Sequence, residues 1–332
     1  LEVDPPDGAD WKREALDSLS WRDLEPEEIA LCPPLILLGS DEMLAGQGLS
    51  QLIWLLNSGL PVKVLVLSEL DFGLLDEPGN NPRANLGMLA LAQRKAFVAQ
   101  TSVADTGHFA GSLSQALRHA GPALVQAYAP SPRRHGFAPR DSLAQAQRAV
   151  DCRVLPLFRY DPAADGVFGS RISLGDNPDD GQPSQTLADW ALGQTRFASG
   201  FSTLADDAAG PLPLQEWLDL DVARRKGKTP FITTLDGDEE RRHAVSRALA
   251  DASAECLTNW QTLQELAGIV TPFTERLEKD IRADLAAEHE AALAAQKKAS
   301  EAEIREIRDK TQAEIASTIR SRLLQLASRK RD

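Results

Sequence analysis

Residues 35–71 have the sequence LILLGSDEMLAGQGLSQLIWLLNSGLPVKVLVLSELD, and this stretch determines the class of fold. Residues 35–38 and most of 62–67 are apolar, as is typical of strands that are covered on both faces. Between them, apolar residues in 44–57 recur with the period of a helix. A strand, a helix and a second strand in this order predict a β-α-β unit with two parallel strands.

The same alternation continues along the chain. Three further strand-like runs and three helix-like runs follow, with strands expected at 96–100, 123–128 and 154–158 and helices at 86–94, 109–119 and 142–150. This order predicts an α/β fold, a doubly wound and mostly parallel sheet with helices on both faces.

Composition divides the chain into four parts: an acidic lead-in (1–31), the α/β domain (32–213), a helical extension (214–270) and a long helix (271–332). Within the α/β domain, 162–213 is rich in Gly, Pro, Asp and Ser, which predicts a wrapping surface loop with one helix near 186–193. In the extension, helical patterns cover 214–226 and 238–268.

The last part is dense in Ala, Glu, Arg, Lys and Ile, and begins with Thr271-Pro272, a typical helix start. Apolar residues recur every eleven positions, at Leu293, Ile304, Ile315 and Leu326. An eleven-residue repeat keeps an apolar stripe on one face of a nearly straight helix. A helix of roughly 58 residues would be about 87 Å long. It is either a solvated projecting helix or a coiled-coil arm that binds a helical partner or a second copy.

Charge and composition exclude some classes of function. The net charge of −13 argues against nucleic-acid binding, which needs clustered Lys and Arg. Residues 274–332 carry 13 Lys/Arg and 12 Asp/Glu, a net charge of +1, so the first 273 residues carry −14. The three cysteines form no CxxC motif, and no apolar run is long enough to span a membrane. We expect a soluble cytoplasmic protein, and the start at Leu1 suggests a fragment or a processed product.

Two acidic turns follow neighbouring strands. Asp41 comes directly after the first strand, and Glu69 and Asp71 follow the second. Ligands of open parallel sheets bind at the carboxyl ends of the strands, so Asp41 and Glu69, 28 positions apart, can meet at one Mg²⁺. The helix after Asp41 would point its first N–H groups at a phosphate. Alternatively, Asp41 is only an N-cap, and Glu69 and Asp71 are loop acids.

Three further segments match one known family in order. They are FVAQTSVADTGHFAGSLSQALRHAGPALVQAYAPSPRRHGF (97–137), RAVDCRVLPLFRYDP (148–162) and TLADWALGQTRFASGF (186–201). Together they resemble the C-terminal, thiamine-diphosphate-binding domain of pyruvate:ferredoxin (flavodoxin) oxidoreductase, a member of the 2-oxoacid:ferredoxin oxidoreductase family. The resemblance extends over about 31–268.

This resemblance implies oxidative decarboxylation of a 2-oxoacid, with electrons passed to ferredoxin or flavodoxin through the remaining domains or subunits of a larger enzyme. It places the diphosphate of thiamine diphosphate at one turn, formed by Gly39, Ser40, Asp41, Glu42 and Met43. It places Mg²⁺ on Asp41, Glu69 and the carbonyl of Asp71. It implies no catalytic acid or base in this chain, and we expect no turnover by the chain alone.

The sequence also departs from the family pattern at three positions. Glu42 replaces a glycine of the family's Gly-Asp-Gly turn, and Leu74, in the segment LLDEPGNNP, replaces an asparagine on the cofactor side. Ser131 replaces a cysteine that ligates an iron–sulfur cluster, so we expect no cluster in this chain. These departures favour an alternative, a degenerate family member without cofactor that acts as a structural or assembly module through its C-terminal helix.

Overall fold

The computed structural model describes residues 17–18, 20, 23–75, 84–178, 183–205, 208–237 and 239–329. Its backbone divides into two compact units, Leu1–Ile269 and Val270–Asp332. The first unit is called the body below. The second consists of one long helix, and each unit is described by itself.

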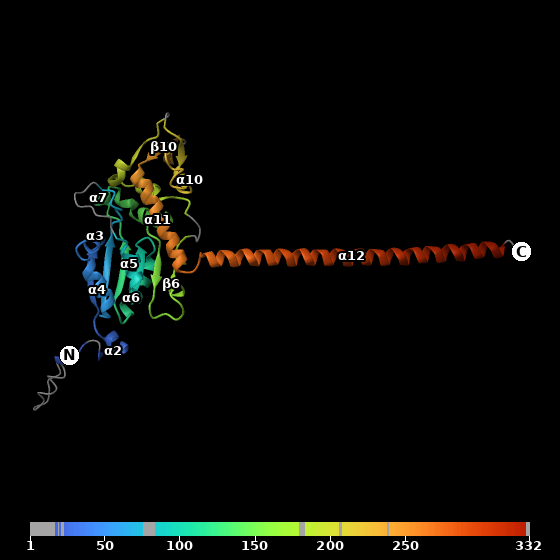
Figure 1. Ribbon diagram of the computed structural model, residues 1–332, viewed down its shortest axis with the longest axis horizontal. Coiled ribbons are helices and arrows are strands. Elements are labelled where there is room, and N and C mark those ends of the chain that lie inside the picture. Colours follow the sequence, from blue (N-terminus) through green and yellow to red (C-terminus); the bar gives the residue numbers. More distant parts are fainter. Residues whose placement is uncertain are drawn as a thin grey trace, which may run out of the picture. The chain divides into compact units, whose positions relative to one another are not determined.

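Figure 1 shows the order of the elements. The strands of the body are β1 (Leu35–Ser40), β2 (Val62–Ser68), β3 (Phe97–Ser102), β4 (Ala123–Tyr128), β5 (Phe158–Tyr160), β6 (Ile172–Ser173), β7 (Phe201–Thr203), β8 (Pro211–Pro213), β9 (Thr229–Asp236) and β10 (Glu239–Val245). The helices are α2 (Pro26–Leu31), α3 (Asp41–Ala45), α4 (Leu49–Ser58), α5 (Leu86–Gln93), α6 (Thr106–Arg118), α7 (Pro132–His135), α8 (Ser142–Asp151), α9 (Leu187–Leu192), α10 (Leu214–Leu218), α11 (Arg247–Leu266) and, in the second unit, α12 (Pro272–Arg329).

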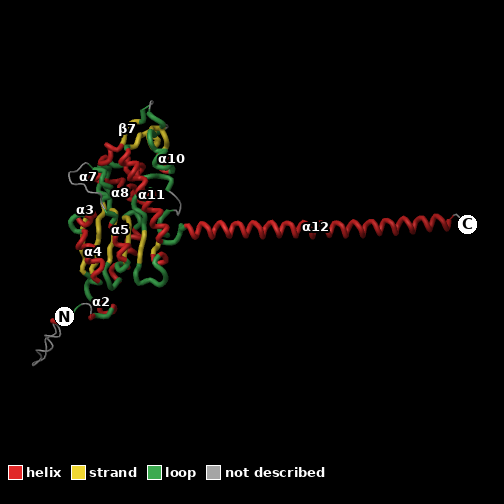
Figure 2. The backbone as a smooth tube through the Cα atoms, viewed as in Figure 1, coloured by secondary structure: helices red, strands yellow, loops and turns green. Residues whose placement is uncertain are grey.

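The main sheet has six strands in the order β1-β2-β4-β3-β5-β6. The first four are parallel, whereas β5 and β6 join antiparallel. Helices cover both faces, so the predicted doubly wound, mostly parallel α/β fold is confirmed (Figure 2).

The alternation of side chains along the strands explains why the sheet is covered on both faces. In β2, Val62, Val64 and Val66 belong to a buried cluster with side chains of α4, α5 and α11, among them Trp260. Leu65 lies between them in sequence and packs on the opposite side, in a cluster that α6 joins through Ala116. Because successive strand side chains point to opposite faces, each face needs its own apolar cover.

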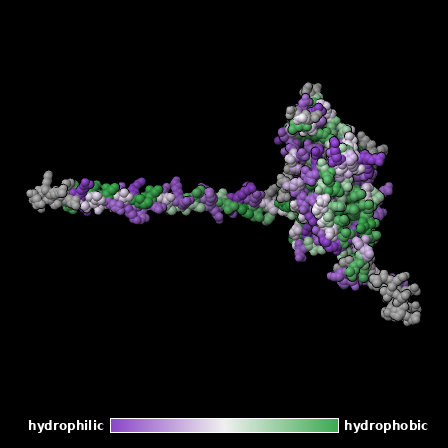
Figure 3. Space-filling model, turned by 180° about the vertical axis from the view of Figure 1, so that it is seen from behind, coloured by the Kyte–Doolittle hydropathy of each residue, from purple (hydrophilic) through white to green (hydrophobic). Residues whose placement is uncertain are grey.

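The edge strand β1 is covered less well than its neighbours. Its apolar residues Leu35, Ile36, Leu37 and Leu38 are all exposed, and Leu38 is 63 % exposed. The indole of Trp54, on α4, is exposed to the same fraction. Figure 3 shows a broad apolar area on the body in the view from behind. A sheet edge with a run of exposed apolar side chains is unusual, because such edges pair readily with other chains.

A second sheet, with the order β7-β10-β9-β8, corrects the sequence prediction for 214–270. The helix expected at 214–226 ends at Leu218, and the first part of the pattern at 238–268 is strand β10. Strand β10 pairs antiparallel with both β7 and β9. The hydrogen bonds to these two strands outweigh the helix propensity of the Glu and Arg residues in β10.

Two other predicted elements differ in detail. The strand expected at 154–158 starts only at Phe158, because 152–157 form a turn and a connection that contains Pro156. Proline removes a backbone donor that a strand inside a sheet would need. The helix expected at 44–57 is divided into α3 and α4 by Gly46, Gln47 and Gly48. The acidic lead-in lies mostly outside the described residues.

Helix α12 confirms the predicted long C-terminal helix, with 58 residues. At 1.5 Å per residue it is about 87 Å long. None of the helices that the structure describes is long and apolar enough to cross a lipid bilayer.

Two glycines with nearly the same positive φ offer a test of the packing around α7. Gly136 ends α7 with φ +75°, and a Cβ atom there would lie 1.7 Å from Thr195 Oγ1. Gly227 has φ +74° with open space around it. We expect Gly136→Ala to lower the free energy of unfolding by about 2–5 kcal/mol, from backbone strain plus overpacking. Gly227→Ala should lower it by about 1–2 kcal/mol, from strain alone.

Urea unfolding followed by tryptophan fluorescence measures both values. Equal losses for the two variants would contradict the close packing of α7 against Thr195.

Candidate functional site

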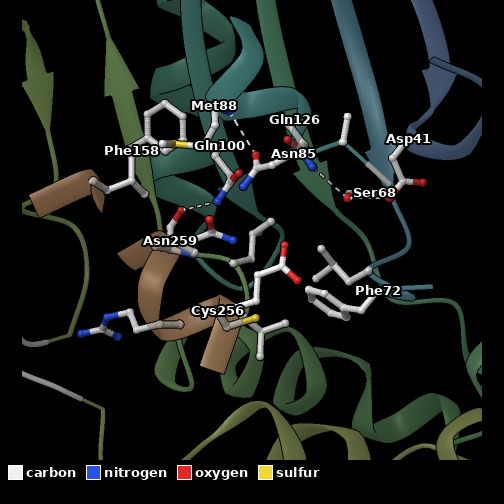
Figure 4. A pocket seen from close by; sticks show the side chains of 18 of the residues that line it. Asp41, Ser68, Phe72, Asn85, Met88, Gln100, Gln126, Phe158, Cys256 and Asn259 are labelled. Atoms are coloured by element: carbon white, nitrogen blue, oxygen red, sulfur yellow. Dashed lines mark hydrogen bonds between the residues drawn. The ribbon is translucent and has the colours of Figure 1, made fainter. Parts of the chain in front are cut away.

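Asp41 joins the carboxyl ends of β1 and β2. Its Oδ2 accepts hydrogen bonds from Ser68 Oγ at 2.9 Å and from the backbone N–H of Glu69 at 3.0 Å. Figure 4 shows Asp41 and Ser68 facing each other across the two strand ends. The spacing of 28 positions therefore brings Asp41 and the start of the second acidic turn together.

The turn predicted to bind a diphosphate is stabilised by its own side chains. Ser40 Oγ accepts from the Met43 N–H at 3.2 Å, and Asp41 Oδ1 accepts from the Glu42 N–H at 2.9 Å. Ser40 is thus the N-cap of α3. Gly39 is the last-but-one residue of β1. Two of the expected amide donors already have acceptors, so a diphosphate would have to replace both hydrogen bonds.

Glu69 lies between opposite electrostatic influences. Its carboxylate forms an ion pair with the Arg134 guanidinium of α7. Burial raises the pKa of Glu69, and the neighbouring carboxylates of Asp41 and Asp71 raise it further, whereas Arg134 and Arg196 lower it. The net shift of this pKa is upward, because burial disfavours the charged form and is the largest of these effects. Three acids are therefore close enough at this edge of the sheet to influence each other.

The chain after β2 has an unusual backbone. Leu70 and Phe72 have φ values of +54° and +55°, which L-residues rarely adopt. Asp71, between them, is only 5 % exposed, and its carbonyl oxygen accepts a hydrogen bond from the Leu74 N–H at 3.0 Å. Such strain persists only where surrounding contacts fix the backbone, and it is common in ligand-binding loops. Most of the segment LLDEPGNNP, from residue 76 on, lies outside the described residues.

Arg196 supplies one of these contacts, although no sequence motif singles it out. Its Nη2 donates to the Leu70 carbonyl at 3.2 Å, and its guanidinium lies over the rings of Trp190 and Phe197. Burial lowers the pKa of Arg196 to about 10, while Tyr128 and the acids of the strand ends raise it. The guanidinium remains protonated at neutral pH and faces the acidic strand ends from the inside of the body.

A cavity of about 160 Å³ opens beside these strand ends. Its lining includes Asp41, Ser68 and Asp71, whereas Glu69 does not line it. Amide side chains and the charged residues Arg153 and Glu255 contribute the other polar groups, and most of the remaining side chains are apolar; among the lining residues are Asn85, Gln100, Gln126, Asn259, Phe72, Met88, Phe158 and Leu263 (Figure 4). The cavity thus has the polar and apolar mixture that small-molecule sites share.

One wall of the cavity is a chain of hydrogen bonds. Gln126 Oε1 accepts from the Gly87 N–H at 3.1 Å, Gln126 Nε2 donates to Ser68 Oγ at 3.0 Å, and Ser68 donates to Asp41. A Cβ atom at Gly87 would lie 2.9 Å from Gln100 Oε1, so the start of α5 approaches β3 and β4 closely because residue 87 is glycine. This row of hydrogen bonds fixes Asp41 through strands that lie far from it in the sequence.

The oxygen atoms at the strand ends suit a hard divalent cation that takes only some of its ligands from the protein. They do not form a metal site in which the protein supplies every ligand. Within the described ranges, no group of three or more His, Cys, Asp or Glu side chains is arranged to hold a metal ion. Mg²⁺ usually takes one or two carboxylates and completes its shell with water and phosphate oxygens. Asp41 Oδ1 and the carbonyl oxygen of Asp71 each accept one protein hydrogen bond and have a lone pair left for a cation, whereas Asp41 Oδ2 already accepts two hydrogen bonds.

Ser131 and Glu42 are two of the residues at which the sequence departs from the family pattern, and the structure shows where each of them lies. Ser131 is the N-cap residue of α7, and its N–H donates to His135 Nδ1 at 3.3 Å. His135 is buried and stacks on Tyr128 with a ring-centroid distance of 6.3 Å. The Glu42 side chain is exposed. Segment 131–136 therefore places Arg134 beside Glu69.

Two curated proteins resemble this chain. It is 32 % identical over 117 residues to the pyruvate-flavodoxin oxidoreductase of Rhodospirillum rubrum, and 29 % identical over 121 residues to the pyruvate:ferredoxin oxidoreductase of Moorella thermoacetica. Each match covers 35 % of this chain, and the matched part spans about a tenth of each relative, 9 % and 10 %. The resemblance indicated by the sequence motifs is thus confirmed. No protein-family model matches the chain.

His135 predicts how the stability of the body depends on pH. Burial, Arg196 and Arg134 lower its pKa to about 4. An unfolded histidine has a pKa of about 6.5, so the unfolded chain binds more protons between pH 6.5 and 4, and stability falls as the pH drops through this window. His135→Phe keeps an aromatic ring and removes the titration. We expect its free energy of unfolding to fall less between pH 7 and 5 than that of the wild type.

The control is His289→Phe, on exposed helix α12, and urea titrations at both pH values give the result. A wild-type pH dependence in His135→Phe would contradict the assignment.

Proposed function

We propose that this chain is the thiamine-diphosphate- and Mg²⁺-binding domain of a 2-oxoacid:ferredoxin or 2-oxoacid:flavodoxin oxidoreductase, with pyruvate as the substrate that the names of the two relatives suggest. The observation that carries the proposal is the hydrogen bond between Asp41 and Ser68, which brings two acidic turns to one edge of a parallel sheet. Sheet edges of this kind are where open α/β folds bind their ligands.

Each residue of the strand ends has a defined part in the proposal. Asp41 and Glu69 would contribute carboxylate oxygens to Mg²⁺, and Asp71 its backbone carbonyl. The turn 39–43 would donate amides to the diphosphate once the hydrogen bonds to Ser40 Oγ and Asp41 Oδ1 are exchanged. Arg196 would hold the Leu70 carbonyl and so fix the strained loop. Thiamine diphosphate, when bound, supplies the electron sink for decarboxylation of a 2-oxoacid.

The open edge of β1 supports a role inside a larger assembly. Leu35, Ile36, Leu37 and Leu38 are exposed on a strand that, among the described residues, has a neighbour on one side only. We propose that another domain or subunit of the oxidoreductase covers this edge. Electrons would reach ferredoxin or flavodoxin through that part of the enzyme, because Ser131 is a poor iron ligand compared with a cysteine thiolate.

Titration calorimetry of the full chain with thiamine diphosphate in the presence of Mg²⁺ tests the proposal. We expect saturable binding to the wild type, and at least about a tenfold loss of affinity in Asp41→Ala, because a ligand of the cation is removed. Asp165→Ala is the matched control, since Asp165 lies in an exposed loop after β5, and should bind like the wild type.

The same titration without Mg²⁺ separates the cation from the cofactor and should show much weaker binding. No heat at millimolar cofactor with a folded wild-type chain would refute the proposal. It would leave the body as a structural or assembly module.

A further inference from the structure

Helix α12 exposes a set of large apolar side chains along its whole length. All are at least 47 % exposed, namely Phe273, Leu277, Ile281, Leu285, Leu293, Ile304, Ile307, Ile315, Ile319 and Leu323. Figure 3 shows hydrophobic groups between hydrophilic ones along the helix. Packing of an apolar face provides most of the stability of helices in proteins, and single helices in water are only marginally stable. The exposed face therefore requires a partner.

The charges on α12 are distributed unevenly. Residues 272–290 contain six acidic and three basic side chains, a net charge of −3. Residues 315–329 contain three arginines and no acidic residue, a net charge of +3. The two ends of the helix are therefore complementary in charge, and a second copy in the opposite direction would match acidic with basic segments.

The helix dipole explains only part of this distribution. Acidic residues are favourable at a helix N-terminus and basic residues at a C-terminus, but the effect falls off within one turn. Asp284, Glu288 and Glu290 lie three or more turns from Pro272, and Arg320 and Arg322 lie about two turns from Arg329. The helix dipole therefore does not account for these charges.

We propose that α12 forms an antiparallel coiled coil with α12 of a second copy of this chain. One antiparallel alignment places apolar residues of the two copies opposite each other at several levels. It pairs Phe273 with Leu323, Leu277 with Ile319 and Ile281 with Ile315. A parallel pair would instead place the two acidic segments together and the two arginine segments together, which costs stability through like-charge repulsion.

The length of α12 is sufficient for a stable dimer. A helix about 87 Å long with a contact strip about 10 Å wide covers about 870 Å² on each copy. Stable interfaces bury about 800 Å² per partner. The eleven-residue spacing of Leu293, Ile304 and Ile315 gives 3.67 residues per turn, which suits two helices that are nearly straight or supercoil slightly to the right.

Sedimentation equilibrium of the full chain tests the association. We expect a dimer for the wild type, and a dissociation constant raised by at least about 100-fold in Ile304→Asp/Ile315→Asp, because two buried apolar contacts are lost. Ala302→Asp/Ala313→Asp adds the same charges eleven positions apart on the opposite face of α12, and should remain dimeric. A monomeric wild type at about 50 µM, a concentration at which micromolar dimers persist, or equal effects of the two double variants, would overturn the proposal.

Disulfide cross-linking tests the direction. Leu277→Cys and Ile319→Cys are made separately in a Cys32→Ser chain, which removes the exposed thiol and leaves the buried Cys152 and Cys256. The two positions are about 63 Å apart on one helix. We expect a disulfide only when the two variants are mixed. Cross-linking of Leu277→Cys with itself would mean a parallel pair and overturn the antiparallel arrangement.

Discussion

The body depends on one constraint, that neighbouring strands of a parallel sheet end at the same edge. Asp41 fixes this edge, because its carboxylate accepts hydrogen bonds from Ser68 and from the Glu69 backbone. Gln126, on β4, extends these hydrogen bonds, because it donates to Ser68 and accepts from the N–H of Gly87 in α5. The cavity, the acidic strand ends and the strained loop after β2 are therefore consequences of strand order and of a few buried polar contacts. Without the adjacency of β1 and β2, Asp41 would not meet Ser68 or Glu69.

Charge balance explains how this edge stays folded. Acidic side chains that crowd together repel each other, and Asp41 and Asp71 add to the effect of burial, which is the main cause of the raised pKa of Glu69. Arg134 compensates from the outside through an ion pair, and Arg196 from the inside, where it also stacks on Trp190. A divalent cation would remove the remaining excess of negative charge. An anionic cofactor alone would add to it, and for this reason the proposed cofactor and Mg²⁺ depend on each other.

The parts of the fold that follow from local patterns were predictable, and those that follow from distant contacts were not. Apolar runs with clear ends predicted β1 to β4, and composition predicted α12. Strand β10 was predicted as helix because its Glu and Arg residues have no strand pattern. It forms a hairpin with β9 and also pairs with β7, which lies much earlier in the chain. The spacing in the sequence predicted that Asp41 and the start of the second acidic turn lie together. It did not predict the position of Arg196, which donates to the Leu70 carbonyl, 126 positions earlier in the chain.

The central claim is that the strand ends of β1 and β2 hold a divalent cation with its cofactor. A crystal structure of the full chain grown with Mn²⁺ and thiamine diphosphate tests this directly, because manganese gives an anomalous signal. The account predicts one strong peak about 2.2 Å from an oxygen of Asp41, a distance typical of hard cations on carboxylates, with the Asp71 carbonyl in the same shell. A cofactor bound elsewhere, or a strand edge without manganese at saturating concentration, would contradict it.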